Sequence, residues 1–176
     1  ERACGGSAAN TIFAVRGFGG QAYYSCRVSN DSTGNYFVSE MRDAGIMTNP
    51  QDPTTSGRSG RCLILVSPDA ERSMNSYLGV SEHLTVDQID ETSLKRSRCL
   101  FIEGYLASST SGTVAATRAR EIADRNNVST SLTLSDPTMV NFFRDALKNI
   151  LGNGISRLFC NEEEARSLLQ IDDTHE

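Results

Sequence analysis

The chain has 176 residues, of which 38% are hydrophobic, so it can bury one sizeable core as a single domain or part of one. Its 22 acidic and 17 basic residues are spread along the sequence and give a net charge of −5, which excludes the basic patch of a nucleic-acid-binding protein. No apolar run approaches the roughly 20 residues that cross a bilayer, and no charged-then-apolar leader opens the chain, so we predict a soluble, cytoplasmic protein.

Cysteine and histidine usage excludes two further classes of site. The five cysteines are scattered and never form a C-x-x-C pair, which argues against a zinc site and against a disulfide framework. We expect most of them to be buried thiols. The two histidines, His83 and His175, stand in a polar segment and beside the end of the sequence, so they are predicted at the surface and do not support a histidine-based triad.

The first predicted element is a glycine turn that opens a helix. Gly5 and Gly6 directly precede a helix predicted from residue 8 to about residue 15. Glycines let backbone N–H groups approach a ligand closely, and a helix N-terminus favours negative charge. Ser7 suits the N-cap, and the Asn10 amide on the first turn can reach a ligand held against the glycines. The segment predicts a pocket for hydroxyls or phosphate, with a simple helix-capping turn as the alternative.

The rest of the first half combines α/β elements with a hairpin. A strand is predicted near residues 22–28, followed by a helix that begins at Gly34 and ends at Gly45. Within the segment from Thr54 to Gly79, two β-leaning runs, 61–66 and 72–78, flank a Pro-Asp turn. This pattern predicts a β-hairpin, which is either a flap over a site or a plain edge hairpin.

The second half alternates strands with helices. Strands are predicted at 99–102, 128–134 and 157–160, helices at 113–126, 139–151 and 162–169, and a Ser/Thr-Gly loop at 108–112. Such alternation is typical of βαβ units around a parallel sheet, so the fold class is α/β. The strands read as apolar runs, as expected when helices cover both faces of the sheet.

Polar side chains follow each predicted strand of this half, at the positions where open α/β sheets bind ligands. They lie in the stretches Glu103–Tyr105, Ser135–Pro137 and Asn161–Glu164. Asp136 is a turn or cap residue by its position before proline. Asn161 and Glu164 share one helical face, where they either cap the helix, the interpretation that the spacing favours, or hold the water shell of a Mg²⁺ ion.

Taken together and in this order, these segments resemble the PfkB/ribokinase family of sugar and nucleoside kinases, and most of all its adenosine-kinase-like members. The resemblance spans nearly the whole chain, and the combination is far more specific than any one motif. The matching stretches are a Gly-Gly...Asn substrate loop at 5–10, a strand-end motif at 28–34, a helix end at 43–46, lid strands at 55–57, 61–66 and 71–74, adenosine-kinase-like stretches at 102–106 and 134–137, and N-x-x-E at 161–164.

The resemblance implies a ribokinase-like α/β fold, a mostly parallel sheet flanked by helices, with a small β lid at about residues 55–79. It implies transfer of phosphate from ATP, with Mg²⁺, to a primary hydroxyl of a nucleoside or sugar, adenosine first. A ribokinase- or fructokinase-like sugar kinase and a non-catalytic PfkB-like binding protein are the alternatives. A homodimer through the lid is a candidate assembly. The implied substrate-binding residues are Gly5, Gly6, Ser7, Asn10 and Tyr105, and the implied metal and phosphate residues are Asn161 and Glu164.

The chain also departs from the family's pattern. Ile12 stands where the family usually has a small residue, Ser29 where it has a glycine, and Arg58-Ser59-Gly60 where its threonine-glycine pattern is tighter. The family's opening strand would precede Glu1, and its G-A-G-D segment, with the catalytic base and anion hole, is expected beyond Glu176. The resemblance therefore covers residues 1–176 as a partial kinase domain, assigns no catalytic residue here, and predicts that these residues alone are inactive.

Overall fold

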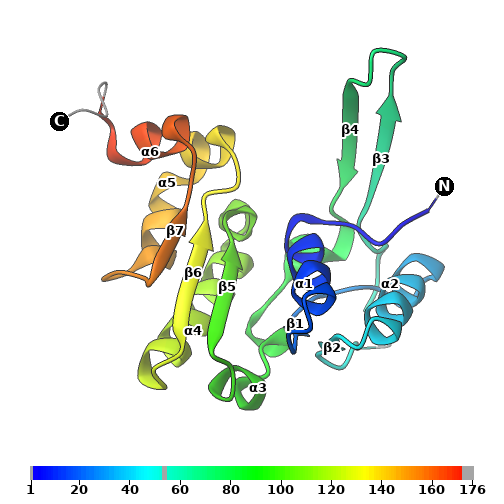
Figure 1. Cartoon of the computed structure of the whole chain (residues 1–176), viewed down its shortest axis with the longest axis horizontal. Coiled ribbons are helices and arrows are strands. Elements are labelled where there is room, and N and C mark those ends of the chain that lie inside the picture. Colours follow the sequence, from blue (N-terminus) through cyan, green and yellow to red (C-terminus); the bar gives the residue numbers. More distant parts are fainter. Residues whose placement is uncertain (1, 53–54, 172–176) are drawn as a thin grey trace. The chain divides into compact units, whose positions relative to one another are not determined.

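The computed structural model describes residues 2–52 and 55–171, and the chain divides into two compact units, residues 1–84 and 85–176 (Figure 1). Within the described ranges, every helix is too short or too polar to span a bilayer.

Some of the sequence predictions concern residues outside the described ranges. Thr54, where the predicted hairpin segment begins, lies outside them, as do His175 and Glu176. The surface position of His175 and the catalytic base expected beyond Glu176 therefore stay predictions, and the described residues of the chain supply no test of either.

The first unit packs two helices on a short parallel strand pair. Helices α1 (Ser7–Gly17) and α2 (Ser32–Asp43) accompany strands β1 (Tyr23–Tyr24) and β2 (Met47–Thr48). The core of this unit consists of Ala9, Ala22, Met41 and Ile46, with the partly buried Cys4, Ile12, Phe13, Tyr24, Phe37 and Ala44 against it.

The strand predicted at residues 22–28 is much shorter than expected. Only Tyr23 and Tyr24 pair with a neighbouring strand. Beyond them, side chains satisfy the backbone: Asn49 Oδ1 accepts from Cys26 N at 2.8 Å, and Asn49 Nδ2 donates to Cys26 O at 3.0 Å. Gln51 Oε1 accepts from Val28 N at 3.2 Å. At residues 26 and 28, these bonds to side chains take the place of a strand ladder.

Helix α2 begins two residues before the predicted start because Asp31 caps it. The Asp31 carboxylate accepts from Gly34 N at 2.7 Å, which satisfies one of the helix's unpaired first-turn donors. At the other end the chain leaves the helix through Gly45, whose φ of +72° suits glycine.

The predicted hairpin is present. Strands β3 (Arg61–Val66) and β4 (Arg72–Tyr77) are antiparallel, with Arg61 opposite Tyr77 and Val66 opposite Arg72. Every residue of both strands is exposed, and the hairpin extends away from α1 and α2 of its unit (Figure 1). A 3₁₀ helix, η1 (Gly79–His83), follows, and His83 is exposed as predicted.

The second unit is built on a parallel sheet of order β5-β6-β7. It confirms the α/β prediction for this half of the chain. The elements in order are η2 (Val86–Gln88), α3 (Glu91–Lys95), β5 (Cys99–Glu103), η3 (Gly104–Ser108), α4 (Thr110–Arg125), β6 (Ser129–Thr133), α5 (Pro137–Leu151), β7 (Arg157–Phe159) and α6 (Glu162–Leu169). Its main core cluster contains Ile102, Ala107, Ala116, Leu132, Leu134, Met139, Val140, Leu147, Ile150 and Leu168.

Two helices of this unit start earlier than predicted, again because of caps. Ser109 Oγ accepts from Gly112 N at 3.0 Å, so α4 begins at Thr110. The prediction of a loop at 108–112 was wrong for most of that stretch. Asp136 Oδ1 accepts from Met139 N at 2.9 Å and Pro137 occupies the first turn, so Asp136 is the cap residue that its position suggested.

The three strands differ in burial, contrary to the expectation of uniformly covered apolar runs. Adjacent residues of β6, Ser131 and Leu132, are 3% and 0% exposed, so both faces of this central strand are covered. Strand β7 is exposed at all its positions. β6 is also rich in serine and threonine, so burial here follows from its central place in the sheet and not from apolarity.

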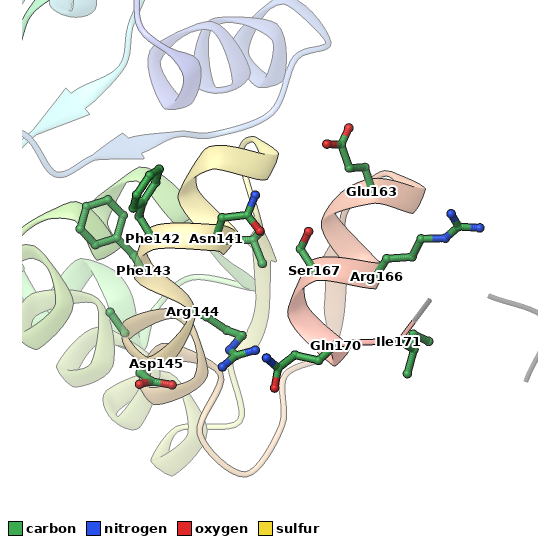
Figure 2. A pocket seen from close by; sticks show the side chains of 12 residues that line it. Asn141, Phe142, Phe143, Arg144, Asp145, Glu163, Arg166, Ser167, Gln170 and Ile171 are labelled. Atoms are coloured by element: carbon green, nitrogen blue, oxygen red, sulfur yellow. The ribbon is translucent and has the colours of Figure 1, made fainter. Parts of the chain in front are cut away.

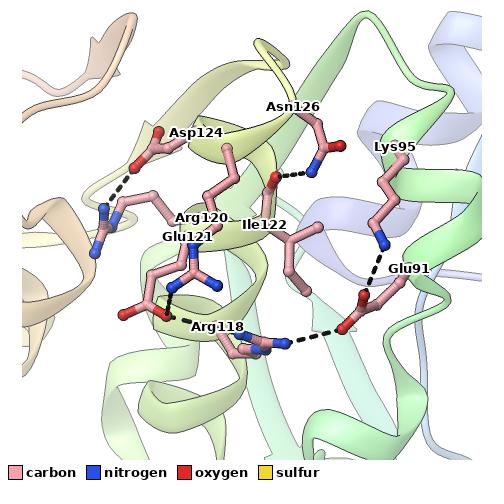
Figure 3. Close-up of polar contacts among 9 residues, drawn as sticks. Glu91, Lys95, Arg118, Arg120, Glu121, Ile122, Asp124 and Asn126 are labelled. Atoms are coloured by element: carbon pink, nitrogen blue, oxygen red, sulfur yellow. Dashed lines mark hydrogen bonds and ion pairs between the residues drawn. The ribbon is translucent and has the colours of Figure 1, made fainter.

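Ion pairs lie along α4, and one of them links α4 to α3 (Figure 3). Glu91 contacts Lys95 and Arg118 at 3.0 Å each, and Arg120 pairs with Asp124 at 2.7 Å. Hydrogen bonds from Lys95 and Arg118 lower the pKa of Glu91. Because the side chains of Glu91, Lys95 and Arg118 are well exposed, their two pairs contribute little to stability.

The cysteines are free thiols, and the expectation that most are buried was wrong. Cys26 is buried and Cys4 is partly buried, whereas Cys62, Cys99 and Cys160 are exposed. Two of the exposed thiols belong to strands with open faces or ends, β3 and β5, and the third directly follows β7.

Candidate functional site

The glycine loop before α1 forms an open helix N-terminus. Gly6, with φ 115° and ψ 148°, occupies the N-cap, and no side chain caps this end. The prediction that Ser7 is the N-cap was wrong. Gly6 takes that position, in a positive-φ conformation that favours glycine, and Ser7 is the first helical residue. Asn10 lies on the first turn as predicted, with its backbone N–H donating to Gly6 O at 2.9 Å.

This loop is accessible to a ligand. Gly5, Gly6, Ser7 and Asn10 are all exposed, and a Cβ added at Gly5 would meet no atom within 4 Å. The first backbone N–H groups of a helix lack intrahelical acceptors. Together with the side-chain amide of Asn10, they supply hydrogen-bond donors to this open space. The neighbouring Cys4 stays a thiol, since partial burial and the charge of Glu40 raise its pKa to about 11.

A second group of predicted residues meets at the carboxyl edge of the β5-β6-β7 sheet. Ser135 Oγ donates to Glu103 Oε2 at 3.3 Å, which joins the ends of β5 and β6. Partial burial of its hydroxyl and the nearby carboxylates of Asp136, Glu103 and Glu164 raise the Tyr105 pKa to about 12. The edge is therefore acidic, with a neutral phenol among its carboxylates.

Two backbone features bring these strand ends together. A Cβ at Gly104 would lie 2.6 Å from Thr133 O and 2.8 Å from Leu134 O, so only glycine permits the approach of the two strand ends. Ser135 has φ +75°, a strained conformation for a residue other than glycine. This conformation turns the chain from β6 towards the cap of α5.

Asn161 and Glu164 form a capping box at the start of α6. Asn161 Oδ1 accepts from Glu164 N at 2.8 Å, while the Glu164 carboxylate accepts from Asn161 N at 3.2 Å and from Asn161 Nδ2 at 3.0 Å. Glu164 is only 6% exposed. The capping interpretation is thus confirmed by geometry.

The same pair has the right donor atoms for the outer shell of a metal ion. The side-chain acceptors are Asn161 Oδ1 and the two carboxylate oxygens of Glu164. Each of these oxygens has a second lone pair, and that lone pair can accept a hydrogen bond from a metal-bound water. Among residues 2–52 and 55–171, no three His, Cys, Asp or Glu side chains are grouped closely enough to ligate a metal directly.

The structure brings the predicted residues into these two groups, one in each unit. The loop group comprises Gly5, Gly6, Ser7 and Asn10, and the edge group comprises Tyr105 with Glu103, Ser135, Asp136 and Glu164. Sequence reasoning missed the Ser135–Glu103 contact, although it named both residues as strand-end candidates.

A separate hollow of about 810 Å³ lies between α5 and α6 (Figure 2). The Arg144 guanidinium points towards Gln170, whereas the Arg166 side chain points away from the hollow (Figure 2). Arg166 pairs with Glu162 at 2.8 Å. Asp145 and Glu163 also line the hollow, so its charges are mixed. None of the predicted site residues is among the described residues that line it.

Comparison with known proteins extends this description. A sequence model described as pfkB family carbohydrate kinase matches residues 1–176. The chain is also similar to a 5-dehydro-2-deoxygluconokinase of Clostridium beijerinckii, with 29% identity over 126 residues, which are 70% of this chain and 37% of that protein.

Solved structures give the same picture of the fold. The crystal structure of adenosine kinase from Sinorhizobium meliloti matches with a TM-score of 0.86 and 31% identity, and that of a probable sugar kinase from Rhizobium etli CFN 42 with a TM-score of 0.86 and 32% identity. Each match covers 96% of this chain and 52% of the other chain. The chain thus spans about half the length of these solved chains.

Proposed function

The chain belongs to the pfkB family of carbohydrate kinases and has its ribokinase-like α/β fold, and from this we propose that its protein transfers the γ-phosphoryl of ATP to a primary hydroxyl of a nucleoside or sugar. The observation that carries the proposal is the family match over all 176 residues. The exposed glycine loop and the hairpin of the first unit support it.

The loop before α1 binds the hydroxyls of the acceptor in this proposal. Gly5 and Gly6 leave space for the ligand, and the first turn of α1 presents backbone donors, the Ser7 hydroxyl and the Asn10 amide. Phosphoryl transfer relies on positioning and on neutralising charge, so the task of this group is to hold the acceptor hydroxyl in place.

The β3–β4 hairpin acts as the lid. Its apolar side chains are exposed on both faces: Leu63 and Leu65 lie on one, and Ile64, Val66 and Met74 on the other. Exposed apolar surface of this kind favours covering a ligand or a second molecule. One face closes over the acceptor and excludes water, and the other is available for a homodimer through the lid.

Asn161 and Glu164 help to hold Mg²⁺ through its water shell. The ion would neutralise charge on the phosphates of ATP. Glu164→Gln separates this role from capping, because glutamine also completes a capping box. We expect the variant to keep its free energy of unfolding within about 1 kcal/mol and to lose about 10-fold to 100-fold in turnover.

Glu162→Gln is the matched control for this variant. It removes the same charge from the same helical turn, but Glu162 pairs with Arg166 and takes no part in the capping box. Turnover of Glu164→Gln equal to that of Glu162→Gln would leave Glu164 with a capping role only.

Adenosine is the first candidate acceptor, and a sugar or sugar acid is the second. The solved chains similar to this one include an adenosine kinase and a probable sugar kinase at nearly equal identity, 31% and 32%. The similarity to a 5-dehydro-2-deoxygluconokinase favours the second candidate. The exposed ring of Tyr105 favours the first, since an aromatic face can stack on a purine.

An ADP-release assay on the complete protein tests the proposal. Adenosine, ribose, fructose and 5-dehydro-2-deoxygluconate are compared at saturating ATP and Mg²⁺. We expect acceptor-dependent turnover of about 1–100 s⁻¹ with one of them. ADP release that no acceptor stimulates, in a protein that binds adenosine by calorimetry, would favour the non-catalytic alternative.

A further inference from the structure

The base of the hairpin is held by a buried cluster of polar groups. Ser59, two residues before β3, is 1% exposed. Its Oγ donates to Asp31 Oδ1 at 2.7 Å and accepts from Ser29 N at 2.9 Å, while its backbone N–H donates to Asp31 Oδ2 at 3.0 Å. We call Ser29, Asp31 and Ser59 the base clamp.

The two arms of the hairpin base are also bonded to each other. Val80 N donates to Arg58 O at 2.9 Å, which links the segment after β4 to the segment before β3. Gly79 has φ +56°, and a Cβ there would lie 2.1 Å from Arg58 O, so the close approach of the arms requires glycine. A group that fixes Ser59 therefore also fixes the second arm.

Asp31 serves two elements at once. The oxygen that accepts from Ser59 Oγ also accepts from Gly34 N at 2.7 Å and caps α2. Burial opposes ionisation of this carboxyl, but the hydrogen bonds from Gly34 and Ser59 outweigh it and lower the pKa to about 2. Asp31 is thus a full carboxylate at neutral pH, and charge-assisted bonds are stronger than neutral ones.

Ser29 adds a further tie to the same base. Its Oγ lies 3.0 Å from the carbonyl oxygens of both Thr55 and Gly57, which share its single proton. The strands of the hairpin are themselves exposed along their whole length, so packing of the strands does little to set the hairpin's direction. The contacts at the base set it instead.

We propose that the base clamp of Ser29, Asp31 and Ser59 fixes the direction of the hairpin relative to the N-terminus of α2, and that these are positioning residues for acceptor binding. The second part rests on the proposed kinase function, whereas the first part does not. The clamp couples lid position to the cap of a helix, so loosening it leaves more lid orientations to be restricted when the acceptor binds.

Asp31→Asn tests the clamp selectively. Asparagine caps helices as well as aspartate does, so the bond to Gly34 is retained, but its Nδ2 cannot accept from Ser59 N. In the complete protein we expect the Ser59 and Val80 amides to exchange with deuterium about 10-fold to 100-fold faster, as for loss of a charge-assisted bond. The Gly34 amide keeps its protection.

Asp90→Asn is the matched control. Asp90 caps α3 by accepting from Ser93 N at 2.5 Å, and it lies in the other unit, away from the hairpin sequence. We expect no change at Ser59 or Val80 in this variant. Unchanged exchange at Ser59 in Asp31→Asn would overturn the proposal, whether or not the protein proves to be a kinase.

Steady-state kinetics tests the positioning role. We expect Asp31→Asn to raise the acceptor KM about threefold to tenfold with a smaller change in kcat, since ordering the lid draws on acceptor binding. Simple loss of folded protein would lower kcat and leave KM unchanged. Ser29→Gly removes only the Oγ bonds and should raise KM less. If the wild type turns over and neither variant shifts KM, the positioning role is wrong.

Discussion

Adding one methyl group at Gly34 should destabilise the first unit strongly. Gly34 is buried in the first turn of α2, and a Cβ there would lie 2.1 Å from Ser29 O, 2.7 Å from Ser59 Oγ and 3.1 Å from Val28 Cβ. To reach an ordinary contact of 3.4 Å, the Ser29 carbonyl must retreat by about 1.3 Å. A movement of the Ser29 backbone also disturbs the hydrogen bond from Ser29 N to Ser59 Oγ in the base clamp.

The expected magnitude follows from opposing effects. Overpacking costs about 1–3 kcal/mol and a weakened cap about 1 kcal/mol, while alanine regains less than about 1 kcal/mol of helix propensity. We therefore expect Gly34→Ala to lower the free energy of unfolding by about 1–4 kcal/mol. Gly17→Ala is the control, because Gly17 is also helical and has open space within 4 Å of its added Cβ.

Urea unfolding of both variants measures the difference in their free energies of unfolding, provided that the dependence of this free energy on urea concentration has the same slope in both. Gly17→Ala should be neutral or stabilising by up to about 1 kcal/mol. If Gly34→Ala is as stable as Gly17→Ala within about 0.5 kcal/mol, the tight approach of Ser29 and Ser59 to α2 is wrong, and with it the geometry of the base clamp.

Three further outcomes are expected. Asn10→Ala should weaken acceptor binding by about 1–3 kcal/mol in calorimetric titration, and an unchanged Kd would make Asn10 a helix residue only. Leu132→Ala, at a fully buried site of β6, should cost about 2–5 kcal/mol in urea unfolding, and a cost below about 1 kcal/mol would contradict its place in the core. Because the pKa of folded Asp31, about 2, lies below its ordinary 3.8, its stabilisation is complete above about pH 5 and is lost as pH falls towards 2. The stability gap between wild type and Asp31→Asn should therefore shrink between pH 5 and about pH 2.5, and a constant gap would refute the assignment.

Elements whose signals lie within a few residues could be predicted from the sequence. Helix α6 begins where it was predicted because Asn161 and Glu164 form its capping box within one turn. The hairpin likewise follows from a local Pro-Asp turn between two β-leaning runs. The errors at the starts of α2, α4 and α5 have one cause: the capping residues Asp31, Ser109 and Asp136 were not used to fix the helix boundary.

Features that depend on distant partners could not be predicted in this way. Strand β1 is short because Asn49 and Gln51, more than 20 positions away, take over the backbone bonds of residues 26 and 28. For the candidate site, the rule that ligands bind beyond the carboxyl ends of parallel strands identified Glu103, Ser135 and Glu164. It could not identify which of them touch, since that depends on the register of β5 against β6 and on the strained turn at Ser135.

The base clamp illustrates the same limit at residues that depart from the family's pattern. Taken one at a time, Ser29 and Ser59 are each a mismatch to a glycine or threonine-glycine pattern. In the structure the backbone N–H of Ser29 donates to Ser59 Oγ, and the Ser59 hydroxyl proton goes to Asp31, so the two mismatches form one connected network. The bond between them uses the backbone N–H of residue 29, which a glycine would also supply, so the Ser59 hydroxyl does not depend on the Ser29 side chain. Replacing Ser59 should therefore cost more stability than replacing the Ser29 side chain, because the Ser59 hydroxyl is buried between Asp31 and the Ser29 N–H, and that N–H remains in place when the Ser29 side chain is removed.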